Sequence, residues 1–476
     1  MQPHYIEFIT VGFGIILLML EAFTDGNKSR IGLIAAGGLT VILGLQCFVC
    51  LCAEVPEWMS RFYKYDSVAL FYKLIALVST ILMLLMAIDF RKVLSRYTSG
   101  DHTCSGLGEF YCLPVFACAG LMWMASSNDL VSIFVALELV TITFYVMVAY
   151  MRRNVGSLEA GVKYLILGAL STGFLVYGIA WIYGATGTTN LDIIANNPQN
   201  EVSSYLLLGI ALILISLGFK IGAAPMQLWI PDVYQGAPTP ITAYLSVASK
   251  AAGFLVLMLI IEPFLNWPGT SHQVITILSI MAGATLLYGN LAALQQENFK
   301  RLLAYSSIAH AGFLVMGVAS RNFTSVSFYL GTYLFMTFSA FFILALVRSE
   351  EGSDLVDAFD GLGKRNPLLA ATLTITMAAL AGIPLTAGFW GKFFIFGASI
   401  QAGISWWLLA IAFISVAAGF YYYLKIVKAM YWNTPRNEQA ISVPIITKAV
   451  LVVLTLAILV FGIYPKPIFD LLTAGN

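Results

Sequence analysis

The chain has 476 residues, of which 59% are hydrophobic and only 10% charged, whereas soluble proteins contain roughly 45–50% and about 25% of these. So few charges cannot cover a soluble body of this size, and a net charge of +1 gives no electrostatic reason to expect a nucleic acid partner. The composition therefore predicts that the chain lies in a lipid bilayer.

Fourteen apolar runs predict an all-α polytopic membrane protein. A membrane-spanning helix needs about 20 apolar residues, and continuous rather than alternating runs favour helices over strands. No long polar insertion separates the runs, so we expect a single integral membrane domain over 1–476. The predicted spans are 5–24, 31–52, 66–88, 109–127, 129–151, 162–185, 203–231, 240–261, 273–295, 302–320, 324–347, 367–399, 404–424 and 443–464.

Lys and Arg are unequally divided between the loops. Sixteen lie in the odd-numbered loops and four in the even-numbered loops and tails. Cytoplasmic loops carry the excess of positive charge, so the odd loops are predicted to be cytoplasmic and both termini to lie on the other side. The first run lacks the basic start and the cleavage site of a secretory signal, and we expect it to be retained as a span. The sixteen are Lys28, Arg30, Arg91, Lys92, Arg96, Arg152, Arg153, Lys300, Arg301, Arg348, Lys364, Arg365, Lys425, Lys428, Arg436 and Lys448; the four are Arg61, Lys64, Arg321 and Lys466.

The other five basic residues fall inside predicted spans, where a central lysine costs about 2.5–3.5 kcal/mol on insertion scales. Lys73 and Lys163 lie near span ends, so we expect their ammonium groups to extend toward the headgroups. Lys220, Lys250 and Lys392 lie deeper in their spans. A purely structural role for all three is the less favoured interpretation.

Glu138 is the acidic counterpart, in the middle of the fifth span. Desolvation lowers the pKa of a lysine toward neutrality and a nearby carboxylate opposes this, so movement of Glu138 relative to Lys220 would change whether that lysine holds a proton. Lys250, His310 and Lys392 are the predicted next stations of a proton relay. For His310 the alternative is an ordinary core histidine. The hydroxyl groups expected to order water beside it are those of Tyr305, Ser306 and Ser307.

Two spans, 203–231 and 367–399, are about 43 and 50 Å long if helical, more than a bilayer needs. Each contains a proline, Pro225 or Pro384, which removes a backbone donor and breaks the helix. A break inside a membrane is tolerated where protein or a water-filled cavity surrounds it. Each break has a lysine close by in sequence, and a freed carbonyl beside an ammonium is a place where a proton or cation can rest.

The two broken spans are the seventh and the twelfth, so they cross the membrane in opposite directions. Inverted repeats with discontinuous helices are typical of secondary transport proteins. The alternative is a pair of ordinary proline kinks. We expect three N-terminal helices in 1–108, a first five-helix repeat in 109–261, a second in 273–424, and a last helix with its tail in 443–476.

Several segments resemble the antiporter-like, proton-translocating membrane subunits of respiratory complex I, the NADH–quinone oxidoreductase. PDVYQGAP and GFWGK are typical of one of these subunits. The chain ends a dozen residues after its last span, unlike the largest of them, which carries a long lateral helix. The segments are ALELVT around Glu138, SLEAGVKYLILGALSTGF (157–174), GFKIGAAPMQLWIPDVYQGAPTPITAYLSVASKAAGF (218–254), NFKRLLAYSSIAHAGF (298–313) and LAGIPLTAGFWGKFFIF (380–396).

The resemblance implies a fourteen-helix fold with two inverted repeats, and it assigns the charged residues to a proton relay. Glu138 matches the glutamate of helix 5, Lys220 and Lys392 the lysines of broken helices 7 and 12, and Lys250 the lysine of helix 8. Lys163 matches a lysine of helix 6 that tunes the site. Pro225 and Pro384 match the helix breaks. Gln227 departs from the pattern, because many relatives have a histidine there and glutamine cannot titrate.

The resemblance also implies where the redox groups lie. The chain has no GxGxxG after a strand, no P-loop and no cysteine framework, so we expect no cofactor or metal here. FMN, iron–sulfur clusters and quinone would belong to partner subunits, and the six cysteines are interpreted as packing residues. Expected partners are other complex I membrane subunits, including antiporter-like neighbours, and the lipid of a bacterial inner (plasma) membrane. The alternative is a subunit of a multisubunit cation/proton antiporter without redox function, and the residues leave open whether H⁺ or Na⁺ moves.

Overall fold

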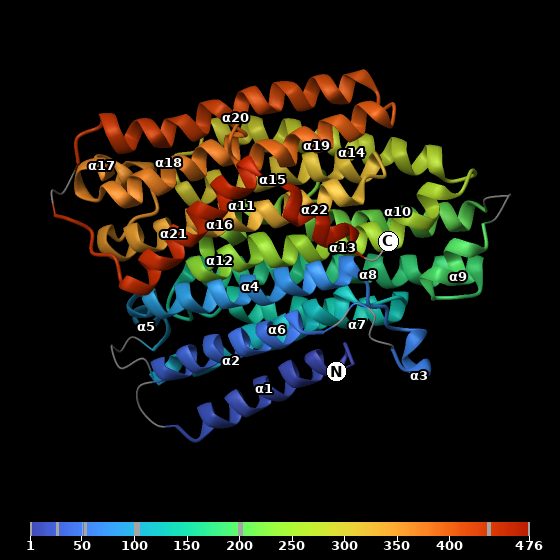
Figure 1. The fold of residues 1–476 in the computed structure, drawn as a ribbon, viewed down its shortest axis with the longest axis horizontal. Coiled ribbons are helices and arrows are strands. Elements are labelled where there is room, and N and C mark those ends of the chain that lie inside the picture. Colours follow the sequence, from blue (N-terminus) through green and yellow to red (C-terminus); the bar gives the residue numbers. More distant parts are fainter. Residues whose placement is uncertain are drawn as a thin grey trace.

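The computed structural model describes residues 2–24, 28–49, 51, 55–99, 105–198, 203–435 and 439–474. In these residues the chain is helical, and the only strand-like pairing is three isolated bridges. Figure 1 shows the long helices running side by side along one direction. The predicted all-α fold is confirmed.

Thirteen helices in the described part of the chain are long and apolar enough to cross a membrane. The remaining predicted span, the twelfth (367–399), is present as two shorter helices, α18 (Pro367–Ala381) and α19 (Ala387–Gln401). The predicted number of spans therefore agrees with the structure. The thirteen are α1 (Tyr5–Ala22), α2 (Ser29–Cys47), α4 (Ser67–Asp89), α6 (Gly108–Ala125), α7 (Leu130–Val148), α8 (Val155–Thr186), α10 (Ser204–Ile221), α12 to α13 (Thr239–Asn266), α14 (Ser271–Leu294), α15 (Phe299–Ala319), α16 (Phe323–Glu351), α20 (Trp406–Trp432) and α21 (Ile445–Ile463).

Short helices mark the two ends of the bundle. Two of them, α5 and α17, lie at one end in Figure 1, and two others, α3 and α9, lie at the other. We name the first end the basic face, because its connections carry most of the loop Lys and Arg, and the second the opposite face. The short elements are α3 (Glu57–Ser60), α5 (Arg91–Thr98), η1 (Ser105–Leu107), α9 (Leu191–Asn196), α11 (Trp229–Gly236), η3 (Val356–Phe359), α17 (Leu362–Arg365) and α22 (Lys466–Thr473).

Side-chain caps set several helix starts. The Asn154 side chain accepts from the amides of Gly156 and Ser157, which satisfies donors that have no partner within the helix. Helix α8 therefore begins at Val155, seven residues before the predicted limit. At the other extreme, α20 continues to Trp432, beyond the predicted end at 424. Consequently some basic residues assigned to loops lie inside helices, near their ends: Lys300, Arg348, Lys425, Lys428 and Lys448.

Both predicted helix breaks are present. Helix α10 ends at Ile221 with Gly222 as its C-cap, and α11 begins at Trp229. Helix α18 ends at Ala381 with Gly382 as its C-cap, and α19 begins at Ala387. The two glycines have φ values of 74° and 92°, a left-handed conformation that only glycine adopts without strain. The breaks lie five spans apart, so the two broken spans cross the bundle in opposite directions, as inverted repeats require. We keep the names first and second repeat for the predicted units, which correspond to α6 to α13 and α14 to α20.

The bundle is most deeply buried around α13, α15 and α16. The most apolar 18-residue window of α15 is 100% buried and that of α16 is 94% buried, against 28% for α8 and for α21. In Figure 1, α1 and α20 lie at opposite edges with α13 and α16 between them. Lys250 on α13 and His310 on α15 therefore occupy the most enclosed part of the bundle.

Candidate functional site

At the first break, Lys220 is in the last turn of α10 and is 7% exposed. Its ammonium donates to the Thr141 hydroxyl at 2.7 Å, which places α7 against the break. One turn earlier on α7, Glu138 accepts a 2.8 Å hydrogen bond from the Thr172 hydroxyl of α8. Glu138 and Lys220, both described residues, form no ion pair. Lys220 instead contacts Thr141, which lies one helical turn after Glu138 on α7.

Glu138 faces outward rather than into the bundle. It lines a largely apolar pocket of about 570 Å³ between α7 and α8, together with Tyr145 and Thr172. A carboxylate facing hydrocarbon is costly unless protein or water covers it. The arrangement therefore indicates that this face of the bundle meets another protein chain rather than bare lipid.

At the second break the lysine comes from the other half of the helix. Lys392 of α19 donates to the carbonyl oxygens of Leu380 and Ala381, both at 2.8 Å, at the end of α18. The last carbonyls of a helix lack partners within it and carry partial negative charge, so this end of α18 favours a cation. The expected pairing of freed carbonyls with an ammonium is present here, whereas Lys220 uses a threonine hydroxyl instead.

Lys250 follows an irregular turn in the middle of its span. Leu245–Ser249 forms a π-turn between α12 and α13, a feature often found at functional sites. The Lys250 ammonium donates to the carbonyl oxygen of Ser307 at 2.5 Å and also to its hydroxyl. It also lies 5.6 Å from the centre of the Tyr333 ring, whose face attracts a cation.

His310 is held between two tyrosine hydroxyls. Its Nδ1 lies 2.5 Å from the hydroxyl of Tyr329, and its Nε2 lies 3.0 Å from that of Tyr423. The Tyr423 hydroxyl also bonds to the Ser306 hydroxyl. A hydroxyl donates and accepts, and a neutral imidazole has one nitrogen of each kind, so the row is compatible with either histidine tautomer.

These contacts link Lys250 through the α15 serines to His310 and Tyr329. Lys220 joins them by packing against Gly253, three residues after Lys250 on α13. Ser306 and Ser307 are neighbours on α15, so the Lys250 contact and the His310 contact meet there. At the far end, the Tyr329 ring packs so closely on Gly391 that a Cβ there would overlap it, and Lys392 is the next residue. We name the set the central polar chain: Lys220, Lys250, Ser307, Ser306, Tyr423, His310, Tyr329 and Lys392.

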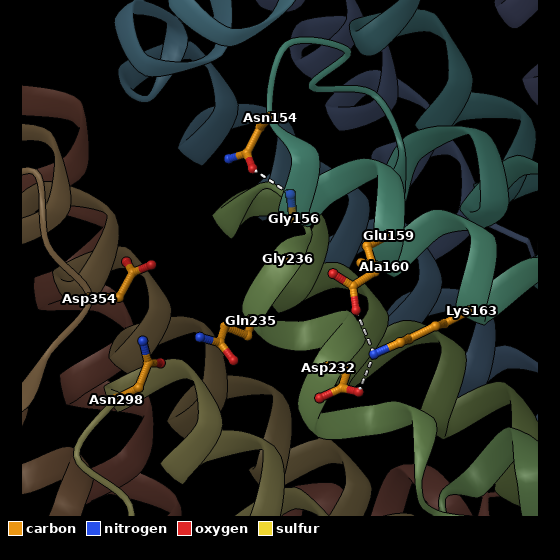
Figure 2. A pocket seen from close by; sticks show the side chains of 10 residues that line it. All are labelled: Asn154, Gly156, Glu159, Ala160, Lys163, Asp232, Gln235, Gly236, Asn298 and Asp354. Carbon is orange, nitrogen blue, oxygen red and sulfur yellow. Dashed lines mark hydrogen bonds and ion pairs between the residues drawn. The ribbon is translucent and has the colours of Figure 1, made fainter.

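A pocket of about 350 Å³ opens on the basic face between α8, α11 and the starts of α15 and η3. Figure 2 shows Lys163 between two carboxylates, with Nζ 2.7 Å from Glu159 and 2.8 Å from Asp232. Lys163 is 42% exposed. Its ammonium reaches the basic face as expected, and it does not contact the central polar chain.

Asp232 ties the two repeats together at this pocket. Its second oxygen accepts from Arg301 of α15 at 3.0 Å, so one carboxylate pairs with a cation from each repeat. Two residues along α11, the Tyr234 hydroxyl lies 3.5 Å from that of Ser307. Helix α11 therefore connects the pocket with the acceptor of Lys250.

Lys73 contradicts the prediction that it extends toward the headgroups. Its side chain is fully buried and pairs with Glu7 of α1 at 2.6 Å. Lys300 also differs from its loop assignment, because it is fully buried, donates to the Ala237 carbonyl at 3.0 Å and lies 3.9 Å from Asp354. The prediction missed both because only the fold brings Glu7 and Asp354 to these lysines.

Other parts of the site were also missed. Tyr329 and Tyr423 lie on α16 and α20, and nothing in their local sequence distinguishes them from core tyrosines. Asp232 could have been singled out from the sequence, because it is an acidic residue directly after the first helix break and two positions before a tyrosine. Of the residues expected to order water, Tyr305 lies instead beside Arg301, 3.4 Å from its guanidinium.

Within the described ranges, no group of three or more His, Cys, Asp or Glu side chains is placed to hold a metal ion. Cys112 and Cys118 are buried packing residues, as interpreted, whereas Cys47 is exposed. Cys50, Cys52 and Cys104 lie outside the described residues, as does Arg436.

The sequence and fold match known membrane proteins. The family model described as "NADH:quinone oxidoreductase/Mrp antiporter, TM" matches residues 127–419. NADH-quinone oxidoreductase subunit N of Heliobacterium modesticaldum is 40% identical, over 98% of this chain and 97% of the relative. Subunit N 2 of Chloroherpeton thalassium is 38% identical, over 97% and 92%. A chain of respiratory complex I from Thermus thermophilus superposes with a TM-score of 0.83 at 31% identity, covering 99% of this chain and 100% of that one.

The fold and the site define an antiporter-like membrane subunit with two broken helices. The chain belongs to the transmembrane family shared by NADH:quinone oxidoreductase and the Mrp antiporter, and within it to subunit N of NADH-quinone oxidoreductase, respiratory complex I. The Mrp antiporter is a relative within the wider family.

Proposed function

We propose that this chain moves protons across the membrane as part of complex I, coupled to electron transfer from NADH to quinone in other subunits. The observation that carries the proposal is the central polar chain, in which three buried lysines, two of them at helix breaks, flank a histidine held by two tyrosines. Buried ionisable groups in a membrane are expensive and mark ion pathways.

Protons reach the central polar chain from the basic face. The pocket beside Lys163 is the polar opening, and α11 leads from Asp232 to Tyr234 and from there to Ser307. Lys163 and Arg301 hold Asp232 in place from two sides. Lys163 therefore tunes the opening through its ion pairs rather than carrying the proton itself.

Glu138 and Lys220 form the input side of the coupling. Glu138 faces the outer pocket and Lys220 faces the interior, with Thr141 between them on α7. A charge on a neighbouring subunit near Glu138 would change the electrostatic potential at Lys220 across a medium of low dielectric constant. Lys250, His310 and Lys392 then pass the proton along the chain, and Pro225 and Pro384 keep both breaks open.

The proposal also includes the location of the redox cofactors and the orientation of the chain in the membrane. FMN, iron–sulfur clusters and quinone bind to partner subunits, so this chain is the non-redox part of a proton-translocating NADH:quinone oxidoreductase. The complex lies in a bacterial inner membrane with the basic face in the cytoplasm. Both termini then lie on the non-cytoplasmic side.

The test uses the purified complex in proteoliposomes and compares proton uptake per NADH oxidised in the wild type and four variants: Glu138→Ala, Lys220→Met, Lys250→Met and Lys392→Met. We expect each to assemble and to lower the proton-to-electron ratio, because each removes a titratable group from the chain. Lys425→Met is the matched control, since Lys425 donates to the Gln296 carbonyl near the basic face. We expect it to leave the ratio unchanged.

An unchanged ratio in all four variants would contradict the relay. A pH gradient that collapses on adding Na⁺ without any NADH oxidation would favour the cation/proton antiporter instead. The two results are separable, because the first is measured per electron and the second without electron transfer.

A further inference from the structure

A second buried charge site lies in the N-terminal helices, away from the central polar chain. The Lys73 ammonium is 2.6 Å from Glu7 Oε1 and 2.6 Å from the Tyr63 hydroxyl. The Tyr63 hydroxyl donates to the same Glu7 oxygen at 2.9 Å. Lys73 is 0%, Glu7 1% and Tyr63 1% exposed, so the three groups form a closed triangle without solvent contact.

Two aromatic rings also surround the ammonium. Lys73 Nζ lies 4.9 Å from the centre of the Tyr63 ring and 4.7 Å from that of Tyr65. The face of each ring attracts a desolvated cation electrostatically. The ammonium therefore keeps a hydroxyl and two ring faces as partners even if the Glu7 carboxylate loses its charge.

Three buried polar atoms at this place have no hydrogen-bond partner among the residues that the structure describes: Oε2 of Glu7, Nδ1 of His4 and Oε1 of Gln46. His4 is one helical turn from Glu7 and its ring centre is 6.2 Å from that of Tyr63, while the Gln46 amide donates to Tyr65. Buried polar groups are nearly always satisfied by protein or ordered water. The triangle is thus incomplete and has acceptor positions where water or a proton can bind.

The site lies near the opposite face. The segment before α4 is extended, so successive side chains alternate. Tyr63 and Tyr65 turn toward Lys73, and the intervening Lys64 lines a cavity of about 470 Å³ that also contains Asp66. Ser126 lines the same cavity and its carbonyl accepts from the Lys64 amide. One layer of residues thus separates the triangle from this cavity.

We propose that Glu7, Lys73 and Tyr63 form a second proton-binding site, which exchanges protons with the opposite face through the cavity lined by Lys64 and Asp66. A proton from water in the cavity binds to Oε2 of Glu7 and converts its carboxylate to a carboxylic acid. The site then changes from a neutral pair to a net charge of +1, which stays on Lys73.

The titratable groups that face Glu7 come from each element packed around it. They are His4 before α1, Tyr63 and Tyr65 of the extended segment, and Lys73 of α4, with Asp66 at the α4 N-terminus. Apart from Asp66, which lies in the cavity, Glu7 is the acidic group of this set. The neutral base that faces Glu7 is His4, and burial lowers its pKa, which disfavours a charged imidazole. We therefore assign the proton to the Glu7 carboxylate.

The test is an infrared difference spectrum of the intact complex in sealed vesicles after a rapid acid jump outside. Wild type and Glu7→Gln are compared in both orientations. When the opposite face is outside, we expect a loss of carboxylate absorption and a gain of carboxylic acid absorption that are missing in Glu7→Gln. With the basic face outside, this signal should appear only after the interior acidifies.

The matched control is Glu21→Gln, at the other end of α1, where Glu21 pairs with the partly exposed Lys28. It should retain the Glu7 signal. Glu7→Asp keeps a carboxyl group and should shift the band, which secures the assignment if Glu7→Gln fails to assemble. A Glu7 signal absent in both orientations would overturn the proposal and make the triangle a static clamp. A signal that responds first to the basic face would overturn the route. NADH-driven pumping tests the central polar chain separately.

Discussion

Lys392 donates to the carbonyl oxygen of Leu380, 2.8 Å away, across the break between α18 and α19. The lysine belongs to the helix that follows the break and its acceptor to the helix that precedes it. In the first repeat, Lys220 belongs to the helix before the break and bonds to another span altogether. The inverted repeats thus use the same elements, a break and a lysine, with different partners.

Gly382 gives Lys392 the space to reach these carbonyls. Its φ is +92°, and a Cβ there would lie 3.1 Å from Cδ of Lys392. A left-handed residue other than glycine costs about 1–2 kcal/mol, so we expect Gly382→Ala to lower the thermal stability of the complex and its proton-to-electron ratio together. Gly397→Ala, on α19 with nothing within 4 Å of its Cβ, should change neither. Equal effects of the two variants would contradict this role for Gly382.

The two tyrosines at His310 can be tested by removing one oxygen each. Tyr329→Phe and Tyr423→Phe keep the rings and delete the hydroxyls that bond to the imidazole. Each loses about 0.5–1.5 kcal/mol of net hydrogen bonding, so the complex should still assemble while proton pumping falls. The control is Tyr421→Phe, because Tyr421 is 64% exposed. Normal pumping in both test variants would exclude these hydroxyls from the path.

Asp232 pairs with two cations, and Glu159 pairs with one. Partly exposed ion pairs contribute only about 0–1 kcal/mol each, so neither Asp232→Asn nor Glu159→Gln should unfold the chain. We expect Asp232→Asn to reduce NADH-driven pumping more, since it removes one ion pair from Lys163 and one from Arg301, whereas Glu159→Gln removes a single pair. The difference should shrink at high salt, which screens charges at the pocket mouth. A larger loss in Glu159→Gln would contradict the bridging role of Asp232.

Labelling of single cysteines checks the orientation. Val155 begins α8 at the basic face and is 79% exposed, and Asn197 follows α9 at the opposite face. In a background without reactive native thiols, Val155→Cys should react with a membrane-impermeant maleimide only from the cytoplasm. Asn197→Cys should react only from outside. The reverse pattern would overturn the predicted topology.

Much of the fold followed from the chain's own pattern. Long apolar runs fixed the number of spans, and the two internal prolines located both breaks, because a missing amide and a glycine act locally. Limits were less accurate where a helix extends beyond its apolar part. Helix α8 begins at a cap on Asn154, and its first turns carry Glu159 and Lys163, so hydropathy alone placed the start too late.

The site was only partly predictable for a related reason. The depth of Lys220, Lys250 and Lys392 in their spans was visible, since a charge in an apolar run is a local signal. The partners were not, because Thr141, Ser307 and Leu380 are chosen by packing between distant helices. Lys73 shows this limit. Its position near a span end predicted that the ammonium extends toward the headgroups, and only the fold places Glu7 beside it.

The complete burial of the apolar window of α15 has a consequence for a charge placed there. A lysine near a lipid-facing surface can stretch to the headgroups or draw water in by thinning the bilayer. The ionisable groups around α15 can neither reach the headgroups nor draw in water from the lipid side, because other helices enclose this helix. A proton added to the central polar chain beside α15 must therefore be stabilised by neighbouring side chains or be transferred along the chain. The same enclosure that makes the site costly to charge thus prevents protons from escaping into the lipid.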